Sequence, residues 1–143
     1  MKEICENLFE MTCPLAHCIS ADFAMGAGIA FTFRAMGVKK ELIKTYKKDK
    51  WTGDGYCLRT IGDNGQVVYN LITKQYYYMK PTYKTLKSAL LDLKRQLIEN
   101  GETEIAMPAI GCGLDKLQWN KVEVIIEEVF DNTSIDVTIC YKY

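Results

Sequence analysis

The stretch Met25-Gly26-Ala27-Gly28 has a counterpart far along the chain in Ile110-Gly111-Cys112-Gly113-Leu114-Asp115. Each stretch follows a run of residues typical of a β-strand and precedes a pattern typical of a helix. Glycine-rich backbone in this position presents unpaired N–H groups at a helix N-terminus, and these groups attract phosphate and other anions. Together the two stretches predict a nucleotide cradle, whereas either one alone is equally typical of a strand-to-helix bend that needs no Cβ.

Polar residues accompany both stretches. Ser20 and Asp22 precede the first, Asp115 closes the second, and Lys74 ends a strand between them. Packing alone gives no reason for a charge at any of these positions. Their presence strengthens the prediction of a binding site.

The composition favours one globular domain over residues 1–143. A hydrophobic content of 48% is enough for a packed core, and eighteen Lys and Arg residues balance eighteen Asp and Glu residues. Because this balance removes the broad attraction of a duplex-binding protein, contact with nucleic acid is expected only at an end, a modified base or a small adduct. No apolar run approaches the roughly 20 residues of a membrane-spanning helix, so we expect no membrane association.

The cysteine pattern argues against a metal centre. The six cysteines show no Cys-x-x-Cys spacing, and His17 is the one histidine that could join them. We therefore predict no bound metal and no cofactor. The sequence shows no secretory signal, and several cysteines fall within apolar strands, where a reduced thiol behaves as a small hydrophobe. Reduced thiols and a cytoplasmic location are expected.

Hydrophobic periodicity divides the chain into alternating strands and helices. Strands are predicted over 2–9, 15–20, 56–61, 67–73, 104–107 and 135–141, and helices over 27–37, 42–46, 82–101 and 119–130. Asn64-Gly65 predicts a hairpin with a type I′ turn, because both central positions of that turn need positive φ. The helix that starts near Thr82 is expected to bury one face, formed by Leu86, Leu90, Leu93, Leu97 and Ile98.

This order of elements predicts an α/β fold with a mixed sheet and helices on both faces, which is a three-layer α/β/α arrangement. In such sheets, ligands bind beyond the carboxyl ends of the strands. Both glycine stretches would lie at that edge.

Lys74 follows the predicted strand 67–73. A lysine just past a strand is usually a solvated charge. If the strand is central, however, its carboxyl end opens onto the cleft of the glycine stretches. A partly desolvated amine there is able to attack an electrophilic carbon such as C1 of an opened sugar.

Asp115 also has two interpretations. It fits the N-cap of the following helix, where a carboxylate accepts hydrogen bonds from first-turn N–H groups. It equally fits a general acid/base beside a phosphate-binding loop, where it would polarise a ribose hydroxyl.

Three further features invite a chemical interpretation. His17 lies inside an apolar strand, which favours a hydrogen-bonded core histidine over a base. Cys112 lies between two glycines, but as a nucleophile it would need His17 to converge on it in the fold. The cluster Tyr76 to Tyr78 either stacks on a base or merely covers the neighbouring core.

Six motifs in order resemble one family: the macrodomains of terminal ADP-ribose protein glycohydrolase and of the antitoxins that reverse DNA ADP-ribosylation. The motifs are Leu15-Ala-His-Cys-Ile-Ser20, Met25-Gly-Ala-Gly-Ile-Ala30, Leu71-Ile-Thr-Lys74, Lys80-Pro-Thr-Tyr83, Met107-Pro108 and Ile110-Gly-Cys-Gly-Leu-Asp-Lys-Leu-Gln-Trp119. They cover nearly the whole chain, with a shortened N-terminus. The resemblance implies an α/β/α macrodomain that binds ADP-ribose and hydrolyses its bond to a target.

The resemblance also implies roles for single residues. Lys74 matches the nucleophile that forms a lysyl-ADP-ribose intermediate, and Asp115 matches the acid/base that resolves it. Ser20 with Gly26, Ala27 and Gly28 would hold the distal ribose. The segment Ala109, Ile110, Gly111, Cys112, Gly113 and Leu114 would wrap the diphosphate through its backbone N–H groups.

The adenine end departs from the family pattern. Where the family has Gly-Asp-Leu-Phe, this chain has Glu6-Asn7-Leu8-Phe9, so Asn7 replaces the aspartate that reads adenine. Its amide oxygen still accepts from an amino group, but the charge is lost. Leu8 stays with the adenine site, and Tyr143 is a candidate stacking partner in a C-terminus that aligns loosely.

We expect a hydrolase that removes mono-ADP-ribose from acidic protein side chains, from DNA bases, or from both. The alternatives are a non-catalytic ADP-ribose reader and, less favoured at zero net charge, a single-strand nucleic-acid module that uses Tyr76 to Tyr78 and the lysines of residues 39–50. The expected partners are ADP-ribose and ADP-ribosylated protein or DNA. The antitoxin branch adds a partner ADP-ribosyltransferase toxin, and we expect a monomer.

Overall fold

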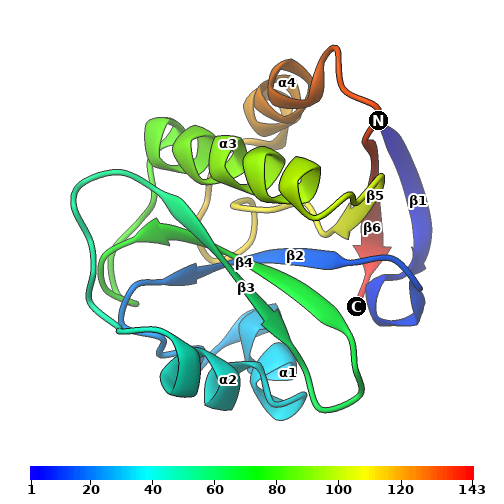
Figure 1. Ribbon diagram of the computed structural model, residues 1–143. Helices are drawn as coiled ribbons and strands as arrows, with labels where there is room; N and C mark the ends of the chain where they lie inside the picture. The colour runs from blue at the N-terminus through cyan, green and yellow to red at the C-terminus, as the bar shows by residue number, and fades with distance from the viewer.

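The computed structural model describes all residues, 1–143, and contains a six-stranded sheet in the order β1-β6-β5-β2-β4-β3. The strands are β1 (Lys2–Asn7), β2 (Leu15–Ser20), β3 (Tyr56–Ile61), β4 (Val67–Lys74), β5 (Glu104–Met107) and β6 (Asp136–Lys142). The helices are η1 (Leu8–Glu10), α1 (Gly28–Ala35), α2 (Val38–Thr45), α3 (Tyr83–Glu99) and α4 (Trp119–Phe130). Figure 1 shows α1 and α2 on one face of the sheet and α3 and α4 on the other, which confirms the predicted α/β/α layers.

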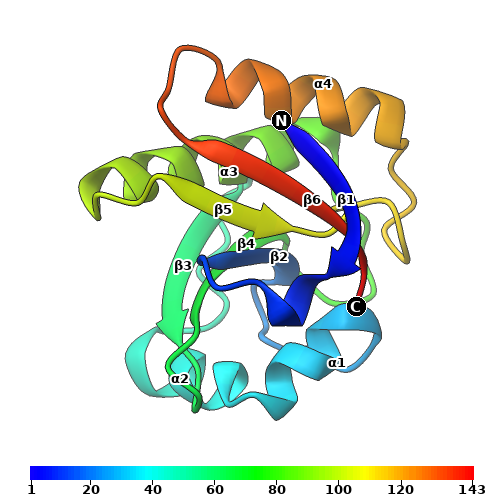
Figure 2. The same cartoon turned by 90° about the vertical axis from the view of Figure 1, so that its right-hand side faces the viewer.

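The sheet is mixed, as predicted. Every neighbouring pair of strands is parallel except β3 and β4, which form the antiparallel hairpin. Turned by 90° in Figure 2, the molecule shows β1 and β6 side by side and the C-terminus next to α1. The carboxyl ends of the parallel strands therefore share one edge of the sheet.

The two central strands are buried on both faces. In β2, Leu15 and Ile19 pack with the α1 and α2 layer, while Ala16 between them packs with the α3 and α4 layer. In β4, Ile72 and Leu71 divide between the layers in the same way. Such near-continuous apolar runs are typical of parallel strands covered by helices.

α3 begins at a capping box. Thr82 accepts from the backbone N–H of Thr85, and the side chain of Thr85 accepts from the backbone N–H of Thr82. The buried face holds Leu86, Leu90, Leu93 and Leu97, each fully buried. The prediction that Ile98 shares this face is wrong: Ile98 is 60% exposed, because it follows Leu97 by about 100° around the helix.

The hairpin between β3 and β4 does not use the predicted type I′ turn. Gly65 has a φ of 81°, whereas Asn64 is not among the residues with positive φ. The N–H of Gly65 donates to the carbonyl of Gly62, and the N–H of Gly62 donates to the carbonyl of Gln66. These bonds define a three-residue loop whose last residue is left-handed, and glycine supplies that conformation.

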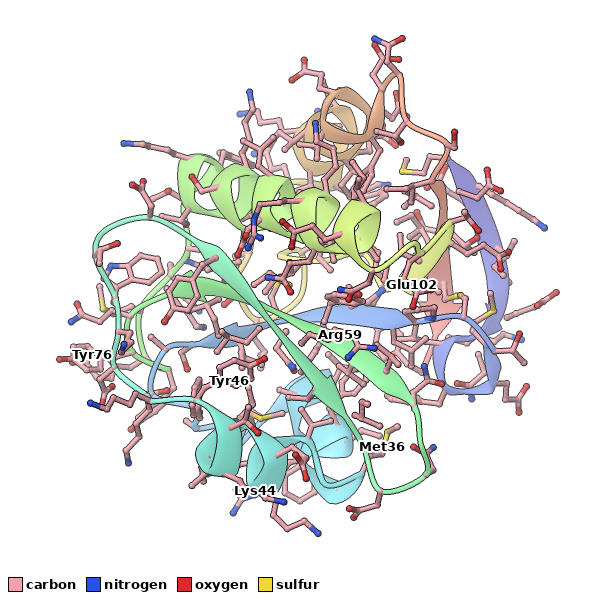
Figure 3. The ribbon with its side chains drawn as sticks, in the orientation of Figure 1. Met36, Lys44, Tyr46, Arg59, Tyr76 and Glu102 are labelled. Atoms are coloured by element: carbon pink, nitrogen blue, oxygen red, sulfur yellow. The ribbon has the colours of Figure 1, made fainter.

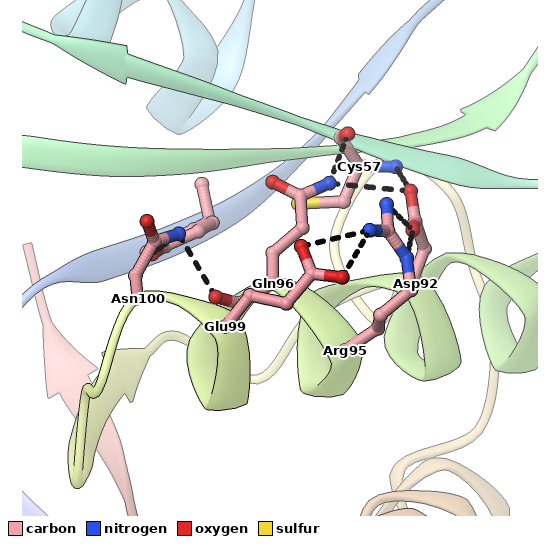
Figure 4. Close-up of polar contacts among 7 residues, drawn as sticks. Cys57, Asp92, Arg95, Gln96, Glu99 and Asn100 are labelled. Carbon is pink, nitrogen blue, oxygen red and sulfur yellow. Dashed lines mark hydrogen bonds and ion pairs between the residues drawn. The ribbon is translucent and has the colours of Figure 1, made fainter.

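Side chains cover the exposed edge of β3. At Cys57, the backbone N–H donates to Asp92 Oδ2 at 2.8 Å and the carbonyl accepts from Gln96 Nε2 at 2.7 Å, both from α3 (Figure 4). From the other layer, the Tyr46 hydroxyl donates to the carbonyl of Arg59, and Figure 3 labels both residues. Blocked backbone groups make an edge strand a poor template for pairing with another chain.

None of the helices in the described chain, residues 1–143, is both long enough and apolar enough to cross a membrane.

Candidate functional site

A cavity of about 700 Å³ opens at the carboxyl ends of β2, β4 and β5. This volume is in the range of clefts that hold small molecules and cofactors. Its wall combines both glycine stretches with Lys74, Asp115 and Ser20. The prediction that the two stretches share one cleft is confirmed.

A register shift places Lys74 opposite Ser20. Up to Ile19 the residues of β2 pair one by one with those of β4, and Ile19 pairs with Ile72. The next pair is Ser20 with Lys74, so Thr73 is an extra residue at the strand end. Bulges of this kind redirect side chains near functional sites. Here the shift places Lys74 opposite Ser20 at the strand ends, and both residues line the cavity.

Lys74 and Asp115 form an ion pair across the cleft. Lys74 Nζ lies 2.7 Å from Asp115 Oδ1, and the two side chains are 13% and 14% exposed. The N-cap interpretation of Asp115 is wrong, because Gln118 is the N-cap of α4. A short, nearly buried pair is suited to passing a proton between its members.

The first glycine stretch leads into α1. Phe23 and Met25 have positive φ angles of 57° and 49° and are buried, which fixes the loop to the core. Gly26 to Gly28 are exposed beyond this anchor. Ala27 is the N-cap and its side chain makes no capping hydrogen bond, so the first N–H groups of α1 are available to an anion at the cleft.

The second glycine stretch is not at a helix N-terminus, which corrects the prediction. α4 begins only at Trp119, and the intervening backbone forms consecutive turns in which Lys116 N–H donates to Gly113 O and Leu117 N–H donates to Gly111 O. The backbone N–H groups of Gly113, Leu114 and Asp115 are not among the donors of the backbone hydrogen bonds. Successive free N–H groups in turns form an anion-binding nest without any helix dipole.

The structure brings most of the predicted binding residues to the cavity. The lining includes Ser20, Gly26, Ala27, Gly28, Ala109, Ile110, Gly111, Gly113, Leu114 and Tyr143. Asn7, Leu8 and Cys112 do not line it. Asn7 Oδ1 accepts from the N–H of Phe9 and caps η1, and Leu8 is fully buried in the α1 and α2 layer. Cys112 packs against the α3 and α4 layer, with its thiol directed to the carbonyl of Ile110.

His17 is a buried core histidine, as predicted. Its Nε2 lies 2.6 Å from Oδ1 of Asn70, the residue of β4 that pairs with it in the sheet. Burial lowers the pKa of His17 to about 4. It packs on Phe33 of α1. Cys112 packs on the opposite side of the sheet, so His17 is no base for its thiol. Burial raises the pKa of Cys112, which further argues against a nucleophilic thiolate.

The sequence singles out Tyr76 to Tyr78 and the motif that begins at Lys80, but it places none of these residues in the binding site. Tyr77 and Lys80 both line the cavity, and Lys80 Nζ donates to the carbonyl of Leu114 at 2.6 Å. The three tyrosines of this segment are exposed. Tyr76 and Tyr78 stack with their ring centroids 5.6 Å apart, and Figure 3 labels Tyr76 at the margin of the molecule. Only the path of the loop brings Lys80 to Leu114, and no spacing in the sequence encodes that path.

The fold and the cleft define a class of protein, an α/β/α domain with a ligand cavity at the carboxyl ends of parallel strands. The chain belongs to the macrodomain family, because the family model described as Macro domain matches residues 16–126. It is 45% identical over 126 residues to the human ADP-ribose glycohydrolase OARD1, covering 87% of this chain and 79% of that protein. A protein of invertebrate iridescent virus 6, Uncharacterized protein 032R, is 29% identical over 67% of this chain and 92% of its own length.

Solved structures agree on the fold. The macrodomain of Mycobacterium tuberculosis DarG superposes with a TM-score of 0.79 at 21% identity, over 99% of this chain and 97% of that one. Thermosipho africanus DarTG in complex with ADP-ribose gives a TM-score of 0.72 at 23% identity, over 95% of this chain and 39% of that one. At these identities the likeness shows the fold alone.

Proposed function

We propose that this protein is an ADP-ribosyl hydrolase that removes mono-ADP-ribose, including terminal ADP-ribose, from a modified acceptor. The single observation that carries the proposal is the Lys74–Asp115 ion pair, 2.7 Å long and nearly buried, inside a cleft lined by glycine-rich backbone. The name of the human relative, ADP-ribose glycohydrolase, supports the same activity.

The ion pair supplies both a nucleophile and a proton acceptor. Asp115 takes a proton from Lys74, and the neutral amine then forms a bond to C1 of the distal ribose while the bond from C1 to the acceptor breaks. The acceptor leaves with the proton that Asp115 held. Water next attacks C1, Asp115 receives its proton, and the bond between C1 and Nζ breaks to release ADP-ribose. The nearly buried position of both side chains keeps bulk water from competing with the amine.

The cleft walls hold the rest of the ligand. The free N–H groups at the start of α1 and at Gly113 to Asp115 bind the distal ribose and the diphosphate. Tyr143 is 62% exposed at the cavity margin and stacks on the adenine. Asn7 pairs with Lys142, directly before Tyr143, so Asn7 and Leu8 support the adenine end from β1. Cys112 contributes only its backbone to the diphosphate loop.

The acceptor is an acidic protein side chain or a DNA base. An acidic side chain suits a protein without a net positive charge, since eighteen basic residues balance eighteen acidic ones. A DNA base suits Tyr77, which is 66% exposed and lines the cavity, because aromatic rings stack on every base. Under identical conditions, the faster release of ADP-ribose from a modified glutamate peptide or from a modified oligonucleotide identifies the acceptor class.

The hydrolase proposal is tested by ADP-ribose release from both substrates. We expect Lys74→Ala and Asp115→Ala each to lower the rate by about a thousandfold or more. Lys87→Ala, an exposed lysine on α3, is the matched control and keeps the wild-type rate. Circular dichroism verifies that each variant is folded. Full activity in both cleft variants would exclude the mechanism.

A non-catalytic ADP-ribose reader is the second candidate, because the cleft geometry suits binding whether or not turnover follows. Calorimetry with ADP-ribose shows binding in both cases. Turnover, or a covalent adduct trapped on Lys74, occurs only in the hydrolase. Binding without either result would assign the protein to the readers.

A further inference from the structure

Asp22 does not line the cavity, yet its carboxylate contacts three segments that do. Its Oδ1 accepts from the Ser20 hydroxyl at 2.5 Å and from the Ala24 N–H at 3.1 Å, and its Oδ2 accepts from the Tyr77 N–H at 3.0 Å. One carboxylate thus joins the end of β2, the first glycine loop and the loop that follows Lys74. We infer that Asp22 is a positioning residue, which fixes the ribose-facing hydroxyl and the loop beside the nucleophile in one arrangement; this inference rests on the proposed function.

The contact to Ser20 fixes the polarity of its hydroxyl. Because the proton of Ser20 is donated to Asp22, the serine oxygen presents only lone pairs to the cavity that it lines. A hydroxyl with this orientation accepts from a ribose hydroxyl and does not donate to one. Asp22 therefore makes Ser20 a selective acceptor for a sugar O–H group.

The contact to Ala24 holds a strained loop. The residues on either side of Ala24, Phe23 and Met25, both have positive φ, a conformation that is costly for residues with a Cβ. The hydrogen bond from Ala24 N–H to Asp22, two residues earlier, favours this turn. The loop ends at Gly26, where the predicted ribose contact begins. Asp22 thereby holds the first glycine loop in position for the proposed contact with the ribose.

The contact to Tyr77 acts on the nucleophile side. Lys74 is held at its backbone, where its carbonyl accepts from the N–H of Ala21 at 2.9 Å, and Asp22 follows Ala21 directly. Three residues after Lys74, the N–H of Tyr77 reaches the same carboxylate. Both ends of the segment 74–77 are therefore attached to residues 21 and 22. This attachment fixes the position of the segment 74–77, both ends of which line the cavity.

Two variants of Asp22 separate these effects. Asp22→Ala removes every acceptor. Asp22→Asn retains one oxygen for Ser20 and Ala24, but it places an amide N–H against the N–H of Tyr77, where two donors repel. The alanine variant is expected to weaken ADP-ribose binding about tenfold and kcat/KM about a hundredfold. The asparagine variant is expected to bind ADP-ribose within about threefold of wild type while its kcat falls about tenfold.

The experiment combines calorimetry with ADP-ribose, hydrolysis kinetics and thermal unfolding. Asp131→Asn, an exposed aspartate after α4, is the matched control and should change none of the readouts. Equal losses in Asp22→Ala and Asp22→Asn, or wild-type affinity and kinetics in Asp22→Ala, would overturn the inference. If the wild type binds ADP-ribose but hydrolyses nothing, the proposed function fails. The inference is then decided by affinity alone: rescue by Asn supports it, and no rescue rejects it.

Discussion

The middle and the end of β4 make polar pairs of very different character. In the middle, His17 of β2 pairs in register with Asn70 of β4, and both are fully buried and joined at 2.6 Å. At the end, the register shifts and Lys74 instead reaches 2.7 Å across the cleft to Asp115. The regular pairing gives a neutral, sealed contact, because burial lowers the pKa of His17 to about 4. The irregular pairing gives a charged contact that opens onto the cavity.

The largest effect on activity and stability is expected when the charged pair at the end of β4 is made neutral, like the pair in the middle. Lys74→Met leaves the Asp115 carboxylate nearly buried and without its cation, and this should abolish hydrolysis and lower the free energy of unfolding by about 3 kcal/mol. Adding Asp115→Leu removes the unpaired charge, so the double variant should recover that stability and remain inactive. Urea unfolding at neutral pH measures both steps.

A double variant that is less stable than Lys74→Met alone would show that the pair contributes to the fold, as the middle pair does. Recovery of stability without recovery of activity would show that the ion pair serves hydrolysis and does not stabilise the fold.

The middle pair should govern acid stability. The pKa of His17 falls from 6.5 to about 4 on folding, so the unfolded chain binds the additional proton between these values. The stabilising contribution is therefore complete above about pH 6.5 and is lost as the pH falls towards 4. From pH 7 to pH 5 the free energy of unfolding should drop by about 2 kcal/mol from this group.

Since His17 is the one histidine of the chain, its ring signals in an NMR titration report on it directly. The signals should stay those of neutral imidazole down to about pH 5. His17→Gln should flatten the pH dependence of the urea midpoint. A titration midpoint near pH 6.5 in the folded protein would contradict the sealed character of the middle pair.

A smaller effect is expected from glycine substitutions, one in the cleft loop and one outside it. Gly111 has a φ of 73°, and a Cβ there would lie 2.9 Å from Leu117 Cδ1. Gly101, which follows α3, has a φ of 67° with open space around it. Both Gly→Ala variants should lose about 1 kcal/mol of stability, because alanine is strained at positive φ. Only Gly111→Ala should also lower the affinity for ADP-ribose, by about tenfold. Equal affinity in the two variants would show that the loop at Gly111 does not contact the ligand.

The elements that the sequence predicted well are those with strong local signals. The continuous apolar run of β2 predicts a strand buried on both faces, and the leucines of α3 follow the helical period of 3.6; the structure matches both. Ile98 shows the limit of such patterns, because an apolar residue next to a buried one need not share its face. The type I′ turn was wrong because Asn-Gly also suits a longer loop in which glycine alone is left-handed.

The candidate site was predicted through its motifs, and its irregular geometry was not. Nothing in the sequence marks the register shift after Ile19, and turns rather than a helix start form the nest at Gly113. Tyr77 and Lys80 join the wall through the path of a loop. Bulges, nests and loop paths depend on tertiary packing, which a local pattern of residue types does not encode.

The smallest effect on stability is expected from breaking exposed ion pairs, which are as short as the cleft pair but are not buried. On α3, Arg95 lies 2.7 Å from Asp92 and 2.9 Å from Glu99, but its side chain is 57% exposed. Water screens such pairs, so Arg95→Ala should leave the urea midpoint unchanged within error at any salt concentration. Asp92→Ala should cost about 1 kcal/mol, because Asp92 Oδ2 also accepts from the backbone N–H of Cys57 at the sheet edge. If instead the Arg95 variant were as unstable as Lys74→Met, length rather than burial would decide what an ion pair does, and the contrast between cleft and surface would fail.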